Sequence, residues 1–379
     1  MEGNTVTPDS PSKPGAGKRR TPETPGNLRP WLMEMIGKAI AAPSIEDLRA
    51  IVRSTRTQIS GFNGFQPDRN SYLERNNVPI LTAESLILEL DQILAARTIE
   101  RARYYLRRMQ RSTVEIKTNG VNDINLNRWK DYEEILTDSL WLFPKRDRSG
   151  PHNAWYWGNF VPQIPHQLIL RFTRKGDWVL DPFAGSGTTL IEAMKLGRNS
   201  VGVELNSDIA MRTRQMVDAS VPRSSKCCVV HGDSASISPS DLLRISGGLK
   251  YRLVILHPPY HDIIRFSEDP RDLSTVADVD SFIRMLGKIV DNNLEVLGDG
   301  GHIALVIGDK YQNGEIVPLG FLSMNMMLGR SLVLKSIVVK NYDATRGKRG
   351  AQDLWKYRAL SGGFYLFKHE YVFIFRHQI

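Results

Sequence analysis

The chain has 379 residues, of which 41% are hydrophobic and 24% are charged, values that are ordinary for a globular protein and exclude a fibrous or fully disordered chain. Lys and Arg outnumber Asp and Glu by 50 to 41, and the net charge of +9 suits an anionic partner without identifying one. The two cysteines, Cys227 and Cys228, are neighbours, which excludes a disulfide-stapled secreted fold and a structural zinc site. No apolar run approaches the length of a membrane span, so we expect a cytoplasmic protein. We also expect no bound metal, because the histidines in or beside the strands lack metal-ligand spacing.

The first part of the chain is predicted to be a disordered tail followed by a helical domain. Residues 1–29 are rich in Pro, Gly, Ser and Thr and cannot bury enough apolar surface to fold. Over residues 30–150 apolar residues recur at helical spacing, with Ser44 as an N-cap and one long amphipathic segment at 83–111. Five arginines end that segment, and they either face a nucleic-acid backbone or form a solvated helix face: Arg101, Arg103, Arg107, Arg108 and Arg111.

Residues 151–379 alternate short apolar runs with helical stretches, which predicts an α/β domain with a doubly wound, mostly parallel sheet. The last two expected strands, SLVLKSIVVK (331–340) and HEYVFIFRH (369–377), have no clear helix between them. This pattern predicts an antiparallel hairpin at one edge of the sheet.

A glycine-containing turn joins the first expected strand of this domain to its helix. Residues 181–189 read DPFAGSGTT, and Gly185 and Gly187 let the backbone turn tightly and approach a ligand closely. Glu204 ends the next strand, where an acid can bind two ribose hydroxyls, and Asp233 follows the third strand, where it can meet an adenine amino group. The turn matches neither a phosphate-binding P-loop nor the dinucleotide fingerprint.

With this string the sequence resembles the S-adenosylmethionine-dependent DNA methyltransferases that methylate adenine N6 or cytosine N4. The resemblance implies the seven-stranded methyltransferase sheet and S-adenosylmethionine as the cofactor. It also implies a cofactor site made of the loop and the two following acids: Asp181, Phe183, Ala184, Gly185, Ser186, Gly187, Thr188, Glu204 and Asp233.

The second string that carries the resemblance is His257-Pro258-Pro259-Tyr260, directly after an apolar strand. The family places Asp, Asn or Ser before the two prolines, and all four positions are expected to be catalytic. A flipped base stacks on the aromatic ring, while a side-chain acceptor and the first proline carbonyl take the amino hydrogens.

Histidine at the first position departs from the family pattern. A neutral imidazole accepts one hydrogen bond, whereas a protonated one only donates. We therefore expect activity to fall as pH drops through the pKa of His257, and a flat rate profile between about pH 5 and pH 8 would contradict this expectation. The alternative is that His257 only caps its strand and the site is altered. Asp262 is either a substitute acceptor or a solvated loop acid.

About 70 residues separate the two strings, which leaves no room between them for a target-recognition domain. Recognition is therefore expected in the helical domain or in the loop over residues 341–363. That loop carries basic residues interleaved with aromatic ones, which favours DNA contact over an ordinary surface loop. The basic residues expected to bind DNA are Arg346, Lys348, Arg349, Lys356 and Arg358.

The sequence thus predicts a DNA amino-methyltransferase that acts on a flipped base in duplex DNA, in restriction–modification or epigenetic marking. A cognate restriction enzyme is an expected partner, and both a monomer and a homodimer suit the fold. Two alternatives stay open, an RNA methyltransferase of the guanine N2 type and a catalytically altered DNA-binding subunit. The choice between adenine and cytosine also stays open.

Overall fold

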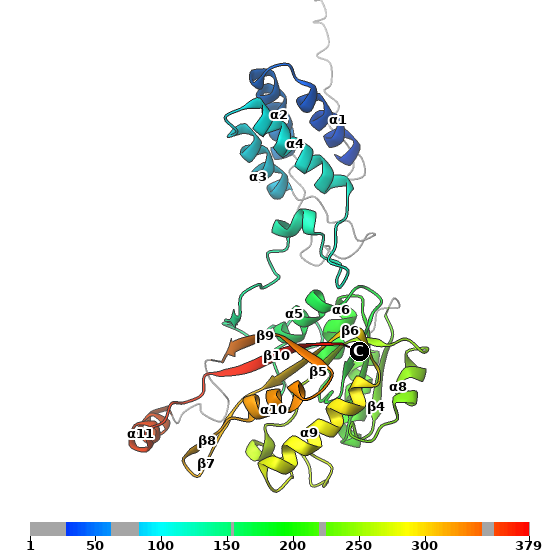
Figure 1. The fold of residues 1–379 in the computed structure, drawn as a ribbon, viewed down its shortest axis with the longest axis vertical. Coiled ribbons are helices and arrows are strands. Elements are labelled where there is room, and N and C mark those ends of the chain that lie inside the picture. Colours follow the sequence, from blue (N-terminus) through cyan, green and yellow to red (C-terminus); the bar gives the residue numbers. More distant parts are fainter. Residues whose placement is uncertain (1–27, 62–82, 153–154, 220–224, 343–351, 379) are drawn as a thin grey trace, which may run out of the picture. The chain divides into compact units, whose positions relative to one another are not determined.

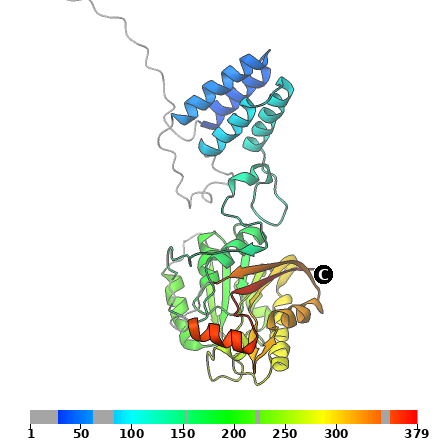
Figure 2. The ribbon, with the colours of Figure 1, turned by 90° about the vertical axis from the view of Figure 1, so that its left-hand side faces the viewer.

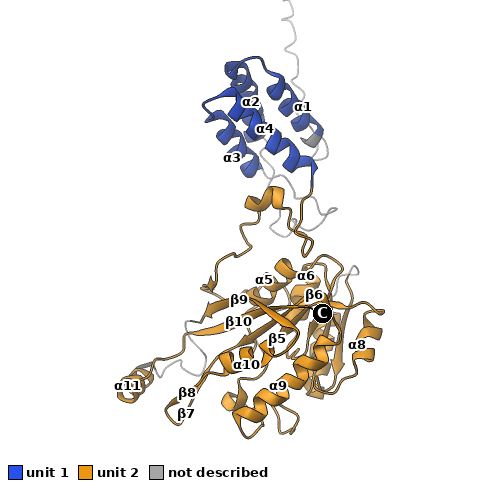
Figure 3. Cartoon of the chain, in the orientation of Figure 1, with its two compact units in different colours: residues 1–68, 80–115 blue, residues 69–79, 116–379 orange. Residues whose placement is uncertain are grey.

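The computed structural model describes residues 28–61, 83–152, 155–219, 225–342 and 352–378 (Figures 1 and 2). The chain divides into two compact units, which Figure 3 shows in different colours. The first unit comprises residues 1–68 and 80–115, and the second comprises residues 69–79 and 116–379.

The described part of the first unit is a helical bundle. Its helices are α1 (Leu28–Ala41), α2 (Ile45–Ser60), α3 (Ala83–Leu94) and α4 (Ile99–Val114). They share one apolar core, whose fully buried members include Leu32, Leu48, Leu90 and Leu106.

The caps of these helices explain where they begin and end. Ser44 caps α2, since its Oγ accepts from the Asp47 N–H at 3.1 Å. The segment 83–111 breaks into two helices, because Thr98 Oγ1 accepts from the Arg101 N–H at 3.2 Å and starts a new helix there. Arg103 donates to the carbonyls of Ile40 and Ala42, which stabilises the end of α1.

The second unit contains a doubly wound sheet whose strand order is β1-β9-β10-β6-β5-β2-β3-β4. The strands pair in parallel except along β10, which runs antiparallel to both of its neighbours. The predicted fold class is therefore confirmed. The strands are β1 (Leu140–Trp141), β2 (Trp178–Asp181), β3 (Asn199–Glu204), β4 (Cys227–His231), β5 (Tyr251–Leu256), β6 (Leu297–Ile307), β9 (Leu332–Asn341) and β10 (His369–His377).

Helices cover both faces of this sheet (Figure 1). Leu253 and Ile255 of β5 pack on one side against α5 (Gln163–Phe172) and α6 (Thr188–Lys195). Val254 and Leu256 face the other side, against α8 (Pro239–Ile245), α9 (Val279–Leu294) and α10 (Leu319–Leu328). Because successive side chains of a strand point to opposite faces, the continuous apolar run of β5 fills both cores. Helix α7 (Ser207–Asp218) packs beside β4.

Several elements of this unit were not predicted. β1 adds an eighth strand to the expected seven by pairing with β9 over two residues. A separate hairpin forms from β7 (Lys310–Gln312) and β8 (Glu315–Val317). Helix α11 (Gln352–Gly362) lies within the predicted loop between β9 and β10, and Figure 1 shows it at the end of a long connection, away from the strands.

Residues 116–150, which the sequence grouped with the helical domain, pack on the sheet unit instead. Asn122 Nδ2 donates to the Arg171 carbonyl at 2.7 Å, and Arg198 pairs with Asp123 at 3.0 Å. The boundary between the two units therefore lies near residue 115 rather than at 150. None of the helices in the described ranges combines the length and apolar character that a membrane crossing requires.

Candidate functional site

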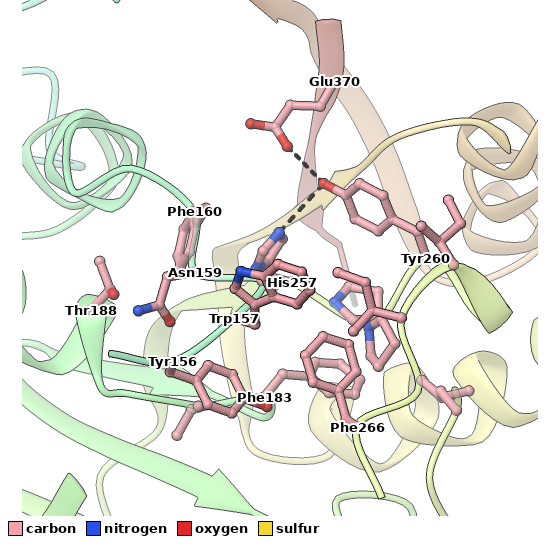
Figure 4. A pocket seen from close by; sticks show the side chains of 18 of the residues that line it. Tyr156, Trp157, Asn159, Phe160, Phe183, Thr188, His257, Tyr260, Phe266 and Glu370 are labelled. Carbon is pink, nitrogen blue, oxygen red and sulfur yellow. Dashed lines mark hydrogen bonds between the residues drawn. The ribbon is translucent and has the colours of Figure 1, made fainter. Parts of the chain in front are cut away.

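A cavity of about 1330 Å³ opens in the sheet unit where β2, β3 and β5 end. β2 lies between β3 and β5 in the middle of the sheet, so the chain leaves its carboxyl end at a topological switch point, the usual ligand site of such folds. The cavity brings together most residues of the two predicted strings (Figure 4). The predicted site residues that line the cavity are Phe183, Ala184, Gly185, Thr188, Glu204, Asp233, His257, Pro258, Pro259 and Tyr260.

The loop after β2 depends on its glycines for its shape. Gly185 and Gly187 have φ of +48° and +75°, in the left-handed region that favours glycine. A Cβ on Gly185 would lie 2.9 Å from the Tyr156 ring, and one on Gly187 would lie 2.9 Å from Thr213 Cγ2. The loop can therefore keep this course only with glycine at both positions.

Three acids surround the loop, and each is held by hydrogen bonds. Glu204 accepts from the N–H groups of Gly185 and Asn206, both at 2.9 Å, and burial raises its pKa. Its carboxylate still has lone pairs for a ligand, because two oxygens can accept about four hydrogen bonds. Asp233 accepts from the Ala235 N–H at 2.8 Å and the Ser236 hydroxyl at 3.0 Å.

Asp181 lies behind the loop rather than on the cavity wall. It is buried, accepts from the Phe183 N–H at 2.9 Å, and burial raises its pKa to about 6. The structure therefore gives Asp181 a part in shaping the loop. Ser186 and Gly187 likewise belong to the loop without lining the cavity.

His257 stands at the end of β5 with its ring between two aromatic side chains. The Phe160 ring lies against it at a centroid distance of 4.6 Å, and Tyr260 meets it edge-on at 5.7 Å. Burial and, to a smaller extent, Lys340 lower the pKa of His257 to about 4, although Glu370 acts in the opposite direction. The ring is therefore neutral at pH 7 and keeps a lone pair.

Two contacts hold the Tyr260 side chain, one at the ring and one at the hydroxyl. Its ring packs on Gly308, where a Cβ would lie 2.9 Å from Cε2, and its Oη donates to Glu370 Oε2 at 2.7 Å. Pro258 is buried behind it. The sequence indicated Tyr260 but not Glu370. In the last strand, HEYVFIFRH, the pattern of residues does not indicate that the side chain of Glu370 faces the cavity.

Asn159 is a second residue that sequence reasoning missed. Its Oδ1 accepts from the Ser186 hydroxyl at 2.7 Å, and it lines the cavity. Its Nδ2 is buried and has no hydrogen-bond partner in the described part of the chain. A buried donor without a partner costs about 1–3 kcal/mol, which marks it as a donor available to a ligand. The cluster of aromatic residues at 155–160 is the one signal that could have pointed to this segment.

Asp262 does not line the cavity, and its Oδ1 accepts instead from buried Lys310 at 2.6 Å. The same lysine lies 2.7 Å from Nδ1 of His261, a buried residue with a left-handed φ of 54°. This arrangement argues against a substitute acceptor and leaves Asp262 a loop acid that is 55% exposed and paired with Lys310. No cluster of three or more potential metal ligands occurs in the described ranges.

The expected DNA-binding residues are only partly described. Lys356 and Arg358 are exposed on α11, and Arg358 lies over the Trp355 ring, which lines the cavity. Arg346, Lys348 and Arg349 lie outside the described residues. In the helical unit Arg108 donates to Gln92 at 2.6 Å, whereas Arg107 and Arg111 are exposed.

Known proteins match the part of the chain that carries the cofactor loop. The model of the DNA methylase family matches residues 96–214, which end before His257. Type II methyltransferase M.MjaI of Methanocaldococcus jannaschii is 47% identical over 80 residues, 21% of this chain and 26% of the relative. Type II methyltransferase M2.DpnII of Streptococcus pneumoniae is 40% identical over 98 residues, 25% of this chain and 33% of the relative.

Among solved structures, a methyltransferase from Pyrococcus furiosus aligns over 60% of this chain and 88% of its own, with 13% identity and a TM-score of 0.38. The chain spans about a third or less of the length of the two curated relatives that it matches. The matches confirm the predicted resemblance to the DNA methyltransferases that modify adenine N6 or cytosine N4.

The family match indicates S-adenosylmethionine as the cofactor, and the cavity wall suits it. The absence of a side chain at Gly185 lets the Tyr156 ring pack on the loop, and the unpartnered Asn159 Nδ2 can donate to a carboxylate. Glu204 can accept from two hydroxyls. The residues present therefore fit a ligand with a polar amino-acid end and a ribose.

Proposed function

We propose that this protein transfers a methyl group from S-adenosylmethionine to the exocyclic amino group of a base flipped out of duplex DNA, at adenine N6 or cytosine N4. The observation that carries the proposal is that the glycine loop after β2 and the string after β5 line one cavity. The two strings lie 67 residues or more apart in sequence, and nothing but the fold brings them together.

The cofactor end of the cavity would be held by the loop and its acids. Glu204 would bind the ribose hydroxyls, Asp233 the adenine amino group, and the loop from Phe183 to Thr188 would surround the remainder. When bound, S-adenosylmethionine supplies a methyl group on a sulfonium. Enclosure by aromatic side chains would exclude water, and positioning would supply much of the rate.

The base end would be formed by His257, Pro258 and Tyr260. Tyr260 would stack on the flipped base, while the His257 lone pair and the Pro258 carbonyl would accept the two amino hydrogens. Both hydrogens would then lie toward the acceptors, which leaves the nitrogen lone pair free to face the methyl group. The neutral state of His257 at pH 7 supports this role, since an imidazolium could only donate.

The decisive experiment incubates the purified protein with labelled S-adenosylmethionine and unmethylated duplex DNA, then digests the DNA for nucleoside mass spectrometry. N6-methyladenine or N4-methylcytosine is the expected product, and either one also identifies the target base. A parallel reaction with structured RNA tests the alternative substrate. Cofactor binding without methylation of either polymer would contradict the proposal and favour an altered, non-catalytic subunit.

The setting of this activity follows from the same proposal. The relatives are named as Type II methyltransferases, which supports a role in restriction–modification beside a cognate restriction enzyme. Chromosomal DNA as substrate would mean action in the cytoplasm. Lys356 and Arg358 on α11 would contact the DNA backbone, and both a monomer and a homodimer are compatible with this scheme.

A further inference from the structure

Four side chains form a continuous polar chain at the base end of the cavity, and Figure 4 shows three of them, His257, Tyr260 and Glu370. Lys340 of β9 and Glu370 of β10 occupy facing positions in the sheet, and Lys340 Nζ lies 3.1 Å from Glu370 Oε1. Glu370 Oε2 accepts from Tyr260 Oη at 2.7 Å, and Tyr260 Oη lies 3.4 Å from His257 Nε2. All four residues line the cavity, and Lys340 and Glu370 are 5% and 6% exposed.

The direction of each hydrogen bond in this chain is fixed by chemistry. A lysine ammonium only donates and a carboxylate only accepts, so the one hydroxyl hydrogen of Tyr260 points to Glu370. Burial and Glu370 raise the pKa of Tyr260, so that hydrogen stays on the phenol. The Tyr260 oxygen can then offer only a lone pair to His257. Because Nε2 is the ring nitrogen that faces this oxygen, the tautomer with the proton on Nε2 is favoured.

We propose that Glu370 is a positioning residue that acts through Tyr260 to hold His257 as the Nε2–H tautomer, which leaves Nδ1 as the bare acceptor for the target amino group. Nδ1 has no hydrogen-bond partner among the residues that the structure describes. Phe160 lies against the ring face and limits its rotation. The use of Nδ1 as acceptor rests on the proposed function, whereas the tautomer itself does not.

A purely structural ion pair between β9 and β10 is the competing explanation for Lys340 and Glu370. It predicts that neutral replacements change stability without changing the state of the His257 ring. The proposal predicts the opposite for one replacement, Glu370→Gln. Its carboxamide can donate to the Tyr260 oxygen, which frees the phenol hydrogen to turn toward His257 and favours the Nδ1–H tautomer.

The first test reads the tautomer directly, without any methylation. The full chain is labelled with ¹⁵N-histidine, long-range ¹H–¹⁵N correlation spectra are recorded at about pH 7, and His257 is assigned by its loss in His257→Gln. A protonated Nε2 with a bare Nδ1 is expected for the unsubstituted protein. A protonated Nδ1 would overturn the proposal, whatever the enzymatic activity.

The second test compares Glu370→Gln with Glu295→Gln, which changes an exposed acid at the end of α9 that does not line the cavity. Glu370→Gln is expected to increase the Nδ1–H population and to lower kcat by about tenfold to a hundredfold, with the KM for S-adenosylmethionine little changed. Glu295→Gln is expected to change neither. An unchanged His257 tautomer in Glu370→Gln would contradict the proposal.

Two further variants guard against misfolding and separate this proposal from the proposed function. Lys340→Met with Glu370→Gln removes the buried lysine charge that Glu370→Gln alone leaves unpaired, so it shows whether that charge destabilises the fold. Tyr260→Phe with Glu370→Gln removes the phenol hydrogen and should restore the Nε2–H population. If the tautomer behaves as expected but no nucleic acid is methylated, the proposed function fails and the assignment of Glu370 stands.

Discussion

An imidazole and a carboxamide can both offer one lone pair to an amino group, but only the imidazole loses it on protonation. This difference makes the pH dependence of activity a test of position 257, because the DNA methyltransferases that the sequence resembles have Asp, Asn or Ser there. The structure moves the expected acid limb of the activity profile. From the sequence we expected a change in rate within about pH 5 to pH 8, whichever pKa His257 has, whereas burial lowers the pKa of His257 to about 4, below that range.

His257→Asn should therefore retain activity and lose the acid limb that the ring causes. In the unsubstituted enzyme protonation near pH 4 removes the acceptor, so activity falls as pH decreases and is insensitive to His257 above about pH 5. Asp181, with a pKa of about 6, titrates in both proteins, so the ratio of their kcat values isolates His257. His257→Leu removes the acceptor and should lower kcat by about a hundredfold above about pH 5, with a smaller loss where the imidazole is already protonated. A ratio that changes near neutral pH instead would contradict the assigned pKa.

Gly185 carries the second prediction at this scale. Gly185→Ala places a Cβ 2.9 Å from the Tyr156 ring at a φ of +48°, so it should lower S-adenosylmethionine affinity at least about tenfold and cost about 1–3 kcal/mol of stability. Gly329→Ala is the control, because its φ is −74° and its nearest neighbour would lie at 3.6 Å. Isothermal titration and thermal unfolding measure both effects. Equal behaviour of the two variants would show that the loop tolerates a side chain.

At the scale of elements, one buried side chain attaches the segment before the sheet to the sheet itself. Arg198, at the start of β3, is 1% exposed and donates to Thr173 and to the Leu196 carbonyl. Its remaining partner is Asp123, at 3.0 Å. The interaction spans 75 residues of sequence and is one of the contacts that join residues 116–150 to the sheet unit, together with that of Arg171 with the Leu136 carbonyl.

Arg198→Met should destabilise the protein by about 3 kcal/mol, because it leaves Asp123 and two carbonyls without their buried donor. Arg244→Met is the matched control, since its pair with Asp241 has side chains that are 79% and 51% exposed and should contribute less than about 1 kcal/mol. Urea unfolding followed by tryptophan fluorescence gives both free energies. A loss below about 1 kcal/mol for Arg198→Met would mean that the segment is held mainly by other contacts.

The elements also show what the sequence could and could not predict. Alternation of apolar runs and helical stretches sufficed for the doubly wound sheet, because β2, β3 and β5 each carry enough apolar residues to be recognised alone. The two-residue β1 forms only by pairing with the distant β9. The break between α3 and α4 depends on a single cap, Thr98. Within the site, DPFAGSGTT and HPPY are local strings, whereas Lys340 and Glu370 meet only through the register of β9 and β10. Asn159 was recognised as a candidate site residue only from the structure, because its buried Nδ2 has no hydrogen-bond partner among the described residues.

At the scale of the whole molecule, the net charge of +9 suits a polyanion but does not indicate which surface meets it. The structure narrows the choice within the sheet unit. Lys356 and Arg358 are exposed on α11, and the neighbouring Trp355 lines the same cavity as His257. On the proposed function, a duplex whose base enters that cavity would pass close to Trp355, which would bring these two cations near its phosphates.

The double variant Lys356→Ala/Arg358→Ala should therefore weaken duplex binding by about tenfold at low salt and reduce the dependence of log Kd on log salt by up to about 2, since each phosphate contact contributes a slope of about 0.9. The control is Lys226→Ala/Lys288→Ala, which removes the same charge from exposed positions that do not line the cavity. Fluorescence anisotropy over a salt series measures both slopes, with S-adenosylmethionine affinity as a check on folding. If both double variants lose affinity equally, overall charge rather than α11 governs DNA binding. If only the α11 variant changes the slope, this helix is part of the DNA-binding surface.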